Sequence, residues 1–184
     1  MDKKKILAFA ASNSRNSINK KLAFYAANLV ENTIVTFLDL NDFEMPIFSV
    51  DRESDTGIPE LALKFKEEIK NTDGIIISFA EHNGAYSTAF KNIFDWVSRI
   101  NKNIWENKPM LLMATSPGAN GGKTVLNMAA TRFRRGNISK ITEFSLPSFN
   151  LNFSEELGIV DKNLNSEFEQ HLNEFIQELF NLEQ

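Results

Sequence analysis

The chain has 184 residues, a hydrophobic content of 42% and a formal net charge of −4. This length predicts a single domain over residues 1–184 with enough apolar side chains for a buried core, and the composition argues against a disordered chain. The sequence contains no cysteine, which excludes a disulfide scaffold, a zinc–thiolate site and a cysteine nucleophile, and its mildly acidic balance gives no basic footprint for nucleic acid.

The N-terminal segment combines three lysines with an apolar run that ends at Ser12. That run is too short for the apolar region and cleavage site of a signal peptide. No other stretch approaches the length of a membrane span. We therefore expect a cytoplasmic protein without membrane insertion.

The first half of the chain alternates apolar runs with segments of helical periodicity. Residues 5–10 predict a buried strand, and the β-branched residues of 33–40 predict a second one. Between them lies a predicted helix, with Asn16-Ser17 placed to cap it. Residues 41–58 form the longest irregular stretch, and Pro59 suits the first turn of the helix that follows.

The second half continues the same alternation. Residues 74–80 are apolar on both faces, which is typical of a central parallel strand, and 109–115 predict a fourth strand. Residues 138–144 predict a fifth strand, and Ser166 with Glu169 predicts the capping box of the last helix. Strands separated in this way require right-handed crossovers, so we expect a parallel sheet covered on both faces.

In such sheets a ligand binds at the carboxyl ends of the strands, where the strand order reverses. The loop after the first strand, residues 11–17, offers hydroxyls, amides and Arg15 beside a helix start, which suits a phosphate. It lacks the glycines of the dinucleotide fingerprint, so a monophosphate such as that of FMN fits better. A capping turn without a ligand remains the alternative.

Two further loops lie at the same edge of the predicted sheet. In residues 80–85, the Asn83 amide suits the pyrimidine edge of a flavin, and Gly84 lets the backbone come close to it. His82 can stack against the ring or be a surface histidine without a role. Residues 116–122 hold a serine and three glycines, whose N–H groups can reach a planar ring.

The sequence argues against a P-loop nucleotide hydrolase and against a serine hydrolase. The segment 121–124 ends like a Walker A loop, but Pro117 occupies the place of the required first glycine. The Gly-x-Ser-x-Gly pattern of many hydrolases is absent.

Together the three loops resemble the NADPH-dependent FMN reductase family, a group of small flavodoxin-like quinone, azo-dye and flavin reductases. Residues 11–17 match its hydroxyl- and arginine-bearing first loop with alanine for the initial glycine. Residues 80–85 match Pro-Glu-Tyr-Asn-Gly-Ser with Ala80 for proline and His82 for tyrosine, and 90–96 match the helix that follows. Residues 116–122 contain Ser-x-Gly-x-x-Gly-Gly in full.

The resemblance implies an α/β flavodoxin-like three-layer sandwich with a five-stranded parallel sheet of order 2-1-3-4-5. It also implies a set of FMN-binding residues and no metal site. The phosphate would be held by Ser12, Ser14, Arg15, Ser17 and Asn19. The ring would be lined on one side by Glu81, His82, Asn83 and Gly84, and at its other edge by Ser116, Gly118, Gly121 and Gly122.

The activity implied by the resemblance is a hydride relay from NADPH or NADH, through bound FMN, to a flavin, quinone or azo acceptor. No protein acid, base or nucleophile is needed, so no catalytic residue is assigned, although His82 is a candidate for proton delivery. The family implies a homodimer or homotetramer. An FMN-binding electron-transfer protein that does not oxidise NAD(P)H and a regulatory domain without flavin remain alternatives.

Overall fold

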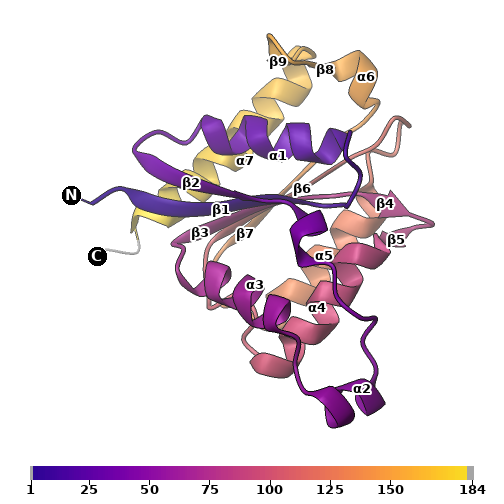
Figure 1. Cartoon of the computed structure of the whole chain (residues 1–184). Helices are drawn as coiled ribbons and strands as arrows, with labels where there is room; N and C mark the ends of the chain where they lie inside the picture. The colour runs from indigo at the N-terminus through magenta and orange to yellow at the C-terminus, as the bar shows by residue number, and fades with distance from the viewer. Residues whose placement is uncertain (1, 182–184) are drawn as a thin grey trace.

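A computed structural model describes residues 2–181. Its main sheet has five parallel strands in the order β2-β1-β3-β6-β7, which is 2-1-3-4-5 when the strands of this sheet alone are numbered (Figure 1). The predicted architecture and strand order are therefore confirmed. The strands are β1 (Lys4–Ala11), β2 (Thr33–Leu38), β3 (Gly74–Phe79), β6 (Met110–Thr115) and β7 (Ile141–Leu146).

Helices cover both faces of the sheet (Figure 1). One face packs against α1 (Ile18–Asn28) and α7 (Lys162–Asn181), the other against α3 (Glu60–Lys70), α4 (Thr88–Ile100) and α5 (Lys123–Arg134). Alternate residues of each central strand enter the two cores, so that Leu7 and Phe9 face one and Ile6 and Ala8 the other. Because both faces are buried, these strands show no apolar–polar alternation.

Short elements occupy the segments between the main strands and helices. The 41–58 region contains the 3-10 helix η1 (Leu40–Phe43) and the helix α2 (Val50–Thr56). The loop after β3 is a small hairpin of β4 (Glu81–His82) and β5 (Ala85–Tyr86). After β7 the chain forms α6 (Phe149–Asn152) and a hairpin of β8 (Phe153–Ser154) and β9 (Gly158–Ile159).

Three predicted boundaries are wrong, each for a local reason. The second strand ends before residue 39 because the Asp39 side chain accepts a hydrogen bond from the N–H of Asn41 and caps η1. The fifth strand begins at residue 141, and Ile138 is 90% exposed in the loop before it. The last helix begins at residue 162, since Asp161 accepts N–H bonds from two residues of its first turn at 2.9 Å.

Within residues 2–181, no helix combines the length and the apolar character that crossing a bilayer requires. The same part of the chain contains no cluster of three or more histidine, aspartate or glutamate side chains that could hold a metal ion.

Candidate FMN site

The three predicted loops meet in one cavity at the carboxyl ends of β1, β3 and β6, beside the point where the strand order reverses. We call this cavity the three-loop pocket. Its volume is about 300 Å³, at the lower end of the range of ligand pockets. Its lining residues are Ser12, Ser14, Asn16, Ser17, Ile18 and Asn19 from the first loop and α1, Ala80, Glu81 and His82 after β3, and Thr115, Ser116 and Pro117 after β6.

The first loop presents hydroxyls and unpaired N–H groups at the start of α1. Ser17 is the N-cap, and its Oγ accepts a hydrogen bond from the N–H of Lys20 at 3.2 Å. Ser12 Oγ accepts one from the N–H of Ser14, also at 3.2 Å. The N–H groups of Ile18 and Asn19, in the first helical turn, have no intrahelical acceptor. Together with the helix dipole they form an anion-binding concavity.

Arg15 is the basic residue of this loop. Its side chain is exposed and makes no hydrogen bond or ion pair with the rest of residues 2–181. The guanidinium group is therefore available to an anion at the helix start.

Asn19 is 3% exposed and its amide ties the pocket to the sheet. Its Nδ2 donates to the carbonyl oxygen of Thr115 at 3.1 Å. Its Oδ1 accepts from the Ser78 hydroxyl at 2.7 Å and from the Thr115 N–H at 3.0 Å. These three bonds join α1 to β3 and β6. The amide therefore holds the frame of the pocket, with one N–H left to offer a ligand.

Glu81 links the second loop to the third. One carboxylate oxygen accepts a hydrogen bond from the N–H of Val125 at 3.0 Å, in the first turn of α5. The N-cap residue of that helix, Gly122, has no side chain to do this. Glu81 thus replaces the missing cap and fixes the two walls of the pocket relative to each other.

Asn83 and Gly84 form the turn of the β4–β5 hairpin. Both have positive φ, 52° and 74°, as a two-residue type I′ turn requires. Gly84 is therefore needed by the turn itself. His82, at the start of this turn, is exposed and lines the pocket.

Two glycines of the third loop are required by packing. A Cβ on Gly121, where φ is 61°, would lie 2.5 Å from Ser145 Oγ and 2.9 Å from the Pro147 nitrogen. A Cβ on Gly122 would lie 2.9 Å from the Cβ of Ala114. These close approaches hold the loop against β6 and β7. Gly118 has no such constraint, since its nearest neighbour would be 3.9 Å away.

Comparison with known protein families shows to which family the chain belongs. The profile of the NADPH-dependent FMN reductase family matches residues 4–154. The chain belongs to this family. The family recognised from the three loops is therefore confirmed, and by its description its members are oxidoreductases that use FMN and NADPH.

Two relatives of this FMN reductase family member are quinone reductases. The 2-hydroxy-1,4-benzoquinone reductase of a Burkholderia species is 36% identical over 119 residues, 64% of this chain and 63% of that protein. The NADPH:quinone oxidoreductase of Arabidopsis thaliana is 24% identical over 169 residues, 86% and 83% of the two chains. The match to the Burkholderia enzyme thus spans less than two thirds of its length.

The fold is also that of a solved flavoenzyme. FerB, an NAD(P)H:(acceptor) oxidoreductase from Paracoccus denitrificans, superimposes with a TM-score of 0.75 over 96% of this chain and 97% of that chain. The sequences are 22% identical, so the likeness shows a shared flavodoxin-like fold.

The residues present fit FMN, the cofactor of the family. The hydroxyls and N–H groups at the start of α1 suit a phosphomonoester. The opposite walls carry the imidazole of His82 and the hydroxyl of Ser116, which suit a flat heteroaromatic ring. Alanine is tolerated at position 11 because this residue belongs to the strand β1 and does not take the positive φ that favours glycine.

The structure brings about half of the predicted FMN-binding residues to the pocket surface. Those that line it are Ser12, Ser14, Ser17, Asn19, Glu81, His82 and Ser116, while Arg15, Asn83, Gly84, Gly118, Gly121 and Gly122 belong to the same loops without lining the cavity. Five other residues line it without having been predicted: Asn16, Ile18, Ala80, Thr115 and Pro117. Their one signal in the sequence is that they adjoin the motif residues.

Proposed function

We propose that this protein is an FMN-dependent oxidoreductase that passes hydride from NADPH or NADH, through bound FMN, to a small-molecule acceptor such as a flavin, a quinone or an azo compound. The observation that carries the proposal is the three-loop pocket, in which the hydroxyl-lined start of α1 and residues of the second and third loops line one cavity. Membership of the FMN reductase family supports the cofactor. The quinone reductases among its relatives support a quinone as acceptor.

The phosphate end of the pocket is proposed to consist of Ser12, Ser14, Arg15 and Ser17. Their hydroxyls and guanidinium group, with the N–H groups of the first turn of α1, neutralise and orient a phosphomonoester. Asn19 positions this end through its bonds to β3 and β6 and offers its remaining N–H.

The ring end is proposed to lie between the second and third loops. FMN, when bound, supplies the hydride-transfer chemistry. The proposed neighbours of the ring are Glu81, His82, Asn83 and Gly84 on one side and Ser116, Gly118, Gly121 and Gly122 on the other. These residues position the ring and restrict water, and the exposed imidazole of His82 is placed to deliver a proton to an acceptor.

A comparison of FMN with riboflavin tests the phosphate end. Riboflavin has the same ring and no phosphate, so the wild-type protein is expected to bind FMN much more tightly. Arg15→Ala should weaken FMN binding about tenfold, because a charge-assisted hydrogen bond to phosphate is lost, and leave riboflavin binding unchanged. Arg135→Ala, an exposed arginine that ends α5, is the matched control. Equal affinities of the wild-type protein for both flavins, or no binding of FMN at micromolar concentration, would refute this site.

A steady-state assay with FMN-loaded protein, NADH or NADPH and the quinone menadione tests the reaction. Oxidation of a nicotinamide that depends on both FMN and menadione is expected. Stable FMN binding without nicotinamide oxidation would instead establish a flavodoxin-type electron carrier. His82→Ala, assayed at saturating FMN, should slow turnover, and full retention of turnover would remove His82 from the mechanism.

A homodimer or homotetramer is proposed from surfaces that the single chain leaves uncovered. Helix α2 buries no residue, and Val50 in its first turn is 70% exposed. Light scattering in solution should give a multiple of the chain mass of 20.9 kDa. A monomer at micromolar concentration would contradict this.

A cytoplasmic location, proposed from the absence of cysteine, is checked by cell fractionation.

A further inference from the structure

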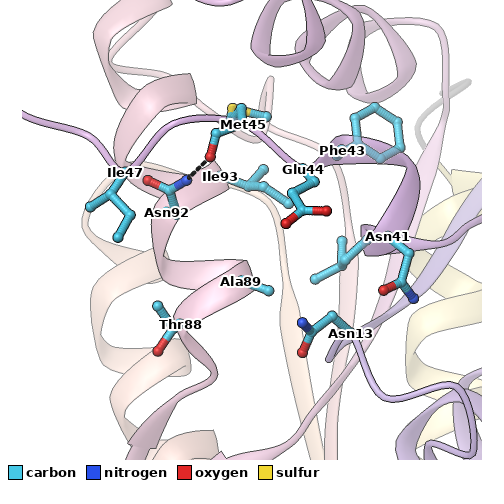
Figure 2. Close-up of a pocket in the computed structure, with 11 residues that line it drawn as sticks. Asn13, Asn41, Phe43, Glu44, Met45, Ile47, Thr88, Ala89, Asn92 and Ile93 are labelled. Carbon is cyan, nitrogen blue, oxygen red and sulfur yellow. Dashed lines mark hydrogen bonds between the residues drawn. The ribbon is translucent and has the colours of Figure 1, made fainter. Parts of the chain in front are cut away.

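A second cavity lies on the other side of the first loop (Figure 2). Its volume is about 230 Å³, and its walls come from the first loop, from η1 with the segment that follows, and from the first turns of α4. Its polar lining side chains are Asn13, Asn41, Glu44, Thr88 and Asn92, and Ala89 and Ile47 are among its apolar residues. Figure 2 shows the Glu44 carboxylate and the amides of Asn13 and Asn41 around one shared space. We call this cavity the Glu44 pocket.

The wall that carries Glu44 is fixed to α4. Asn92 Nδ2 donates to the carbonyl oxygen of Met45 at 3.0 Å, as Figure 2 shows, and Asn92 Oδ1 accepts from the N–H of Phe48 at 2.8 Å. The indole N–H of Trp96 donates to the carbonyl oxygen of Pro46 at 2.7 Å. The segment after η1 is therefore held in place although it has no regular secondary structure, and the pocket is preformed.

The Glu44 pocket adjoins the three-loop pocket through a single stretch of backbone. Ser12 and Ser14 line the three-loop pocket, and Asn13 between them lines the Glu44 pocket. An extended ligand with one end on the flavin side can thus place its other end in the Glu44 pocket. A nicotinamide dinucleotide is such a ligand.

The charges around the Glu44 pocket favour NADH over NADPH. None of the described residues that line it is a lysine or arginine. Nearby, Asp42 is exposed and Asp39 is paired with Lys20 at 2.7 Å. Arg15, in the same loop as Asn13, is not among the lining residues. A carboxylate with adjacent amides suits the hydroxyls of an adenosine ribose, whereas the 2′-phosphate of NADPH needs cationic groups.

We infer that the Glu44 pocket receives the adenosine ribose of the dinucleotide co-substrate and that Glu44 makes the protein select NADH over NADPH. This inference rests on the proposed oxidoreductase function. The start of the thirteen-residue helix α4 supports the inference. Thr88 and Ala89 line the pocket there, and their N–H groups, which have no acceptor within the helix, can face the diphosphate of the ligand. Repulsion between Glu44 and a doubly charged phosphate in a solvent-exposed site is expected to disfavour NADPH by about tenfold or more.

The test compares Glu44→Gln with the wild-type protein, both loaded with FMN, in menadione reduction with each dinucleotide. Glu44→Gln removes the charge and keeps the shape of an exposed side chain. The KM for NADPH is expected to fall about tenfold with kcat unchanged, and the KM for NADH to rise a few-fold. Glu167→Gln, an exposed carboxylate on α7 at the opposite face of the sheet, is the matched control and should leave both KM values unchanged.

Direct binding separates failure of this inference from failure of the proposed function. Calorimetric titration with ADP-ribose and with its 2′-phosphate needs no turnover. The wild-type protein should bind ADP-ribose more tightly, and Glu44→Gln should narrow the difference. Equal affinity of the wild-type protein for the two probes would overturn the role of Glu44. So would a ratio of the KM for NADPH to the KM for NADH that is the same in Glu44→Gln and in the wild-type protein. Tight ADP-ribose binding without oxidation of either dinucleotide would keep the pocket and refute the reductase reaction.

Discussion

Replacement of Asn19 by alanine removes the hydrogen-bonded centre that joins α1 to two strands. The buried amide makes three bonds, one to Ser78 and two to the backbone of Thr115, at 2.7–3.1 Å. Each bond contributes about 1 kcal/mol net, so Asn19→Ala should lower the free energy of unfolding by about 3 kcal/mol. The loss is expected in full because the Thr115 N–H is left buried without a hydrogen-bond partner. That is a large part of the roughly 5–15 kcal/mol that stabilises a typical domain.

Urea denaturation followed by circular dichroism measures this loss as a lower transition midpoint at an unchanged slope. Asn28→Ala, at an exposed position at the end of the same helix, is the matched control and should change the free energy of unfolding by less than about 0.5 kcal/mol. FMN affinity should fall in Asn19→Ala, since the start of α1 is no longer held against the sheet. A stability loss below about 1 kcal/mol would refute the framework role of Asn19.

Three further predictions concern single side chains. Gly121→Ala should lower the free energy of unfolding, measured by calorimetry, by about 2 kcal/mol or more, because φ is 61° and the new Cβ would lie 2.5 Å from Ser145 Oγ. The hydrogen bond from Lys20 lowers the pKa of Asp39, so this carboxylate stabilises the fold above its ordinary value of 3.8 and the stabilisation is lost as the pH falls further, which urea titrations across the acid range detect. Burial raises the pKa of Tyr86 to about 12, so ultraviolet titration should find its phenol protonated well above pH 10.0, and the stability linked to it is lost as the pH rises through the folded-state value.

Each of these predictions has a matched control. Gly118→Ala should be nearly neutral, since the nearest atom to the added Cβ is 3.9 Å away, and an equal effect at both glycines would contradict the packing argument. Asp39→Asn should flatten the acid-range dependence of stability, and an unchanged slope would point to other carboxylates. Tyr25→Phe leaves Tyr86 as the remaining tyrosine for the titration, and a transition near pH 10.0 would contradict its burial.

The sheet could be predicted because its signal is strong and local. All six residues of β3 and of β6 are buried, and runs of this kind are typical of central parallel strands. The ends of the helices and strands are harder to predict, because a capping hydrogen bond depends on the direction of a side chain, which the sequence does not give. Asp161 captures two N–H groups of α7, and nothing in its sequence position ranks it above Ser166.

The sequence predicts which loops form the site, but not what each residue in them does. Hydroxyl side chains at a helix start can be recognised as phosphate-binding groups from their residue type alone. The role of Glu81 depends on Val125, 44 residues away, and that of Gly121 on the strand β7. The sequence does not predict the Glu44 pocket as a site, since it lies in a segment without regular periodicity and Asn92 fixes that segment from α4.

The tight packing of the third loop bears on how flavoproteins are recognised from sequence. Gly121 and Gly122 have no room for a Cβ because of the neighbouring strands, whatever the pocket holds. Selection for foldability alone would preserve such glycines in a descendant that had lost its flavin. A Gly-Gly pair after this strand is thus a marker of ancestry. The hydroxyls of Ser12 and Ser17 are likewise used locally, in a loop bond and a helix cap. The exposed hydroxyl of Ser14, which makes no hydrogen bond to the described residues, is the better indicator of a retained cofactor.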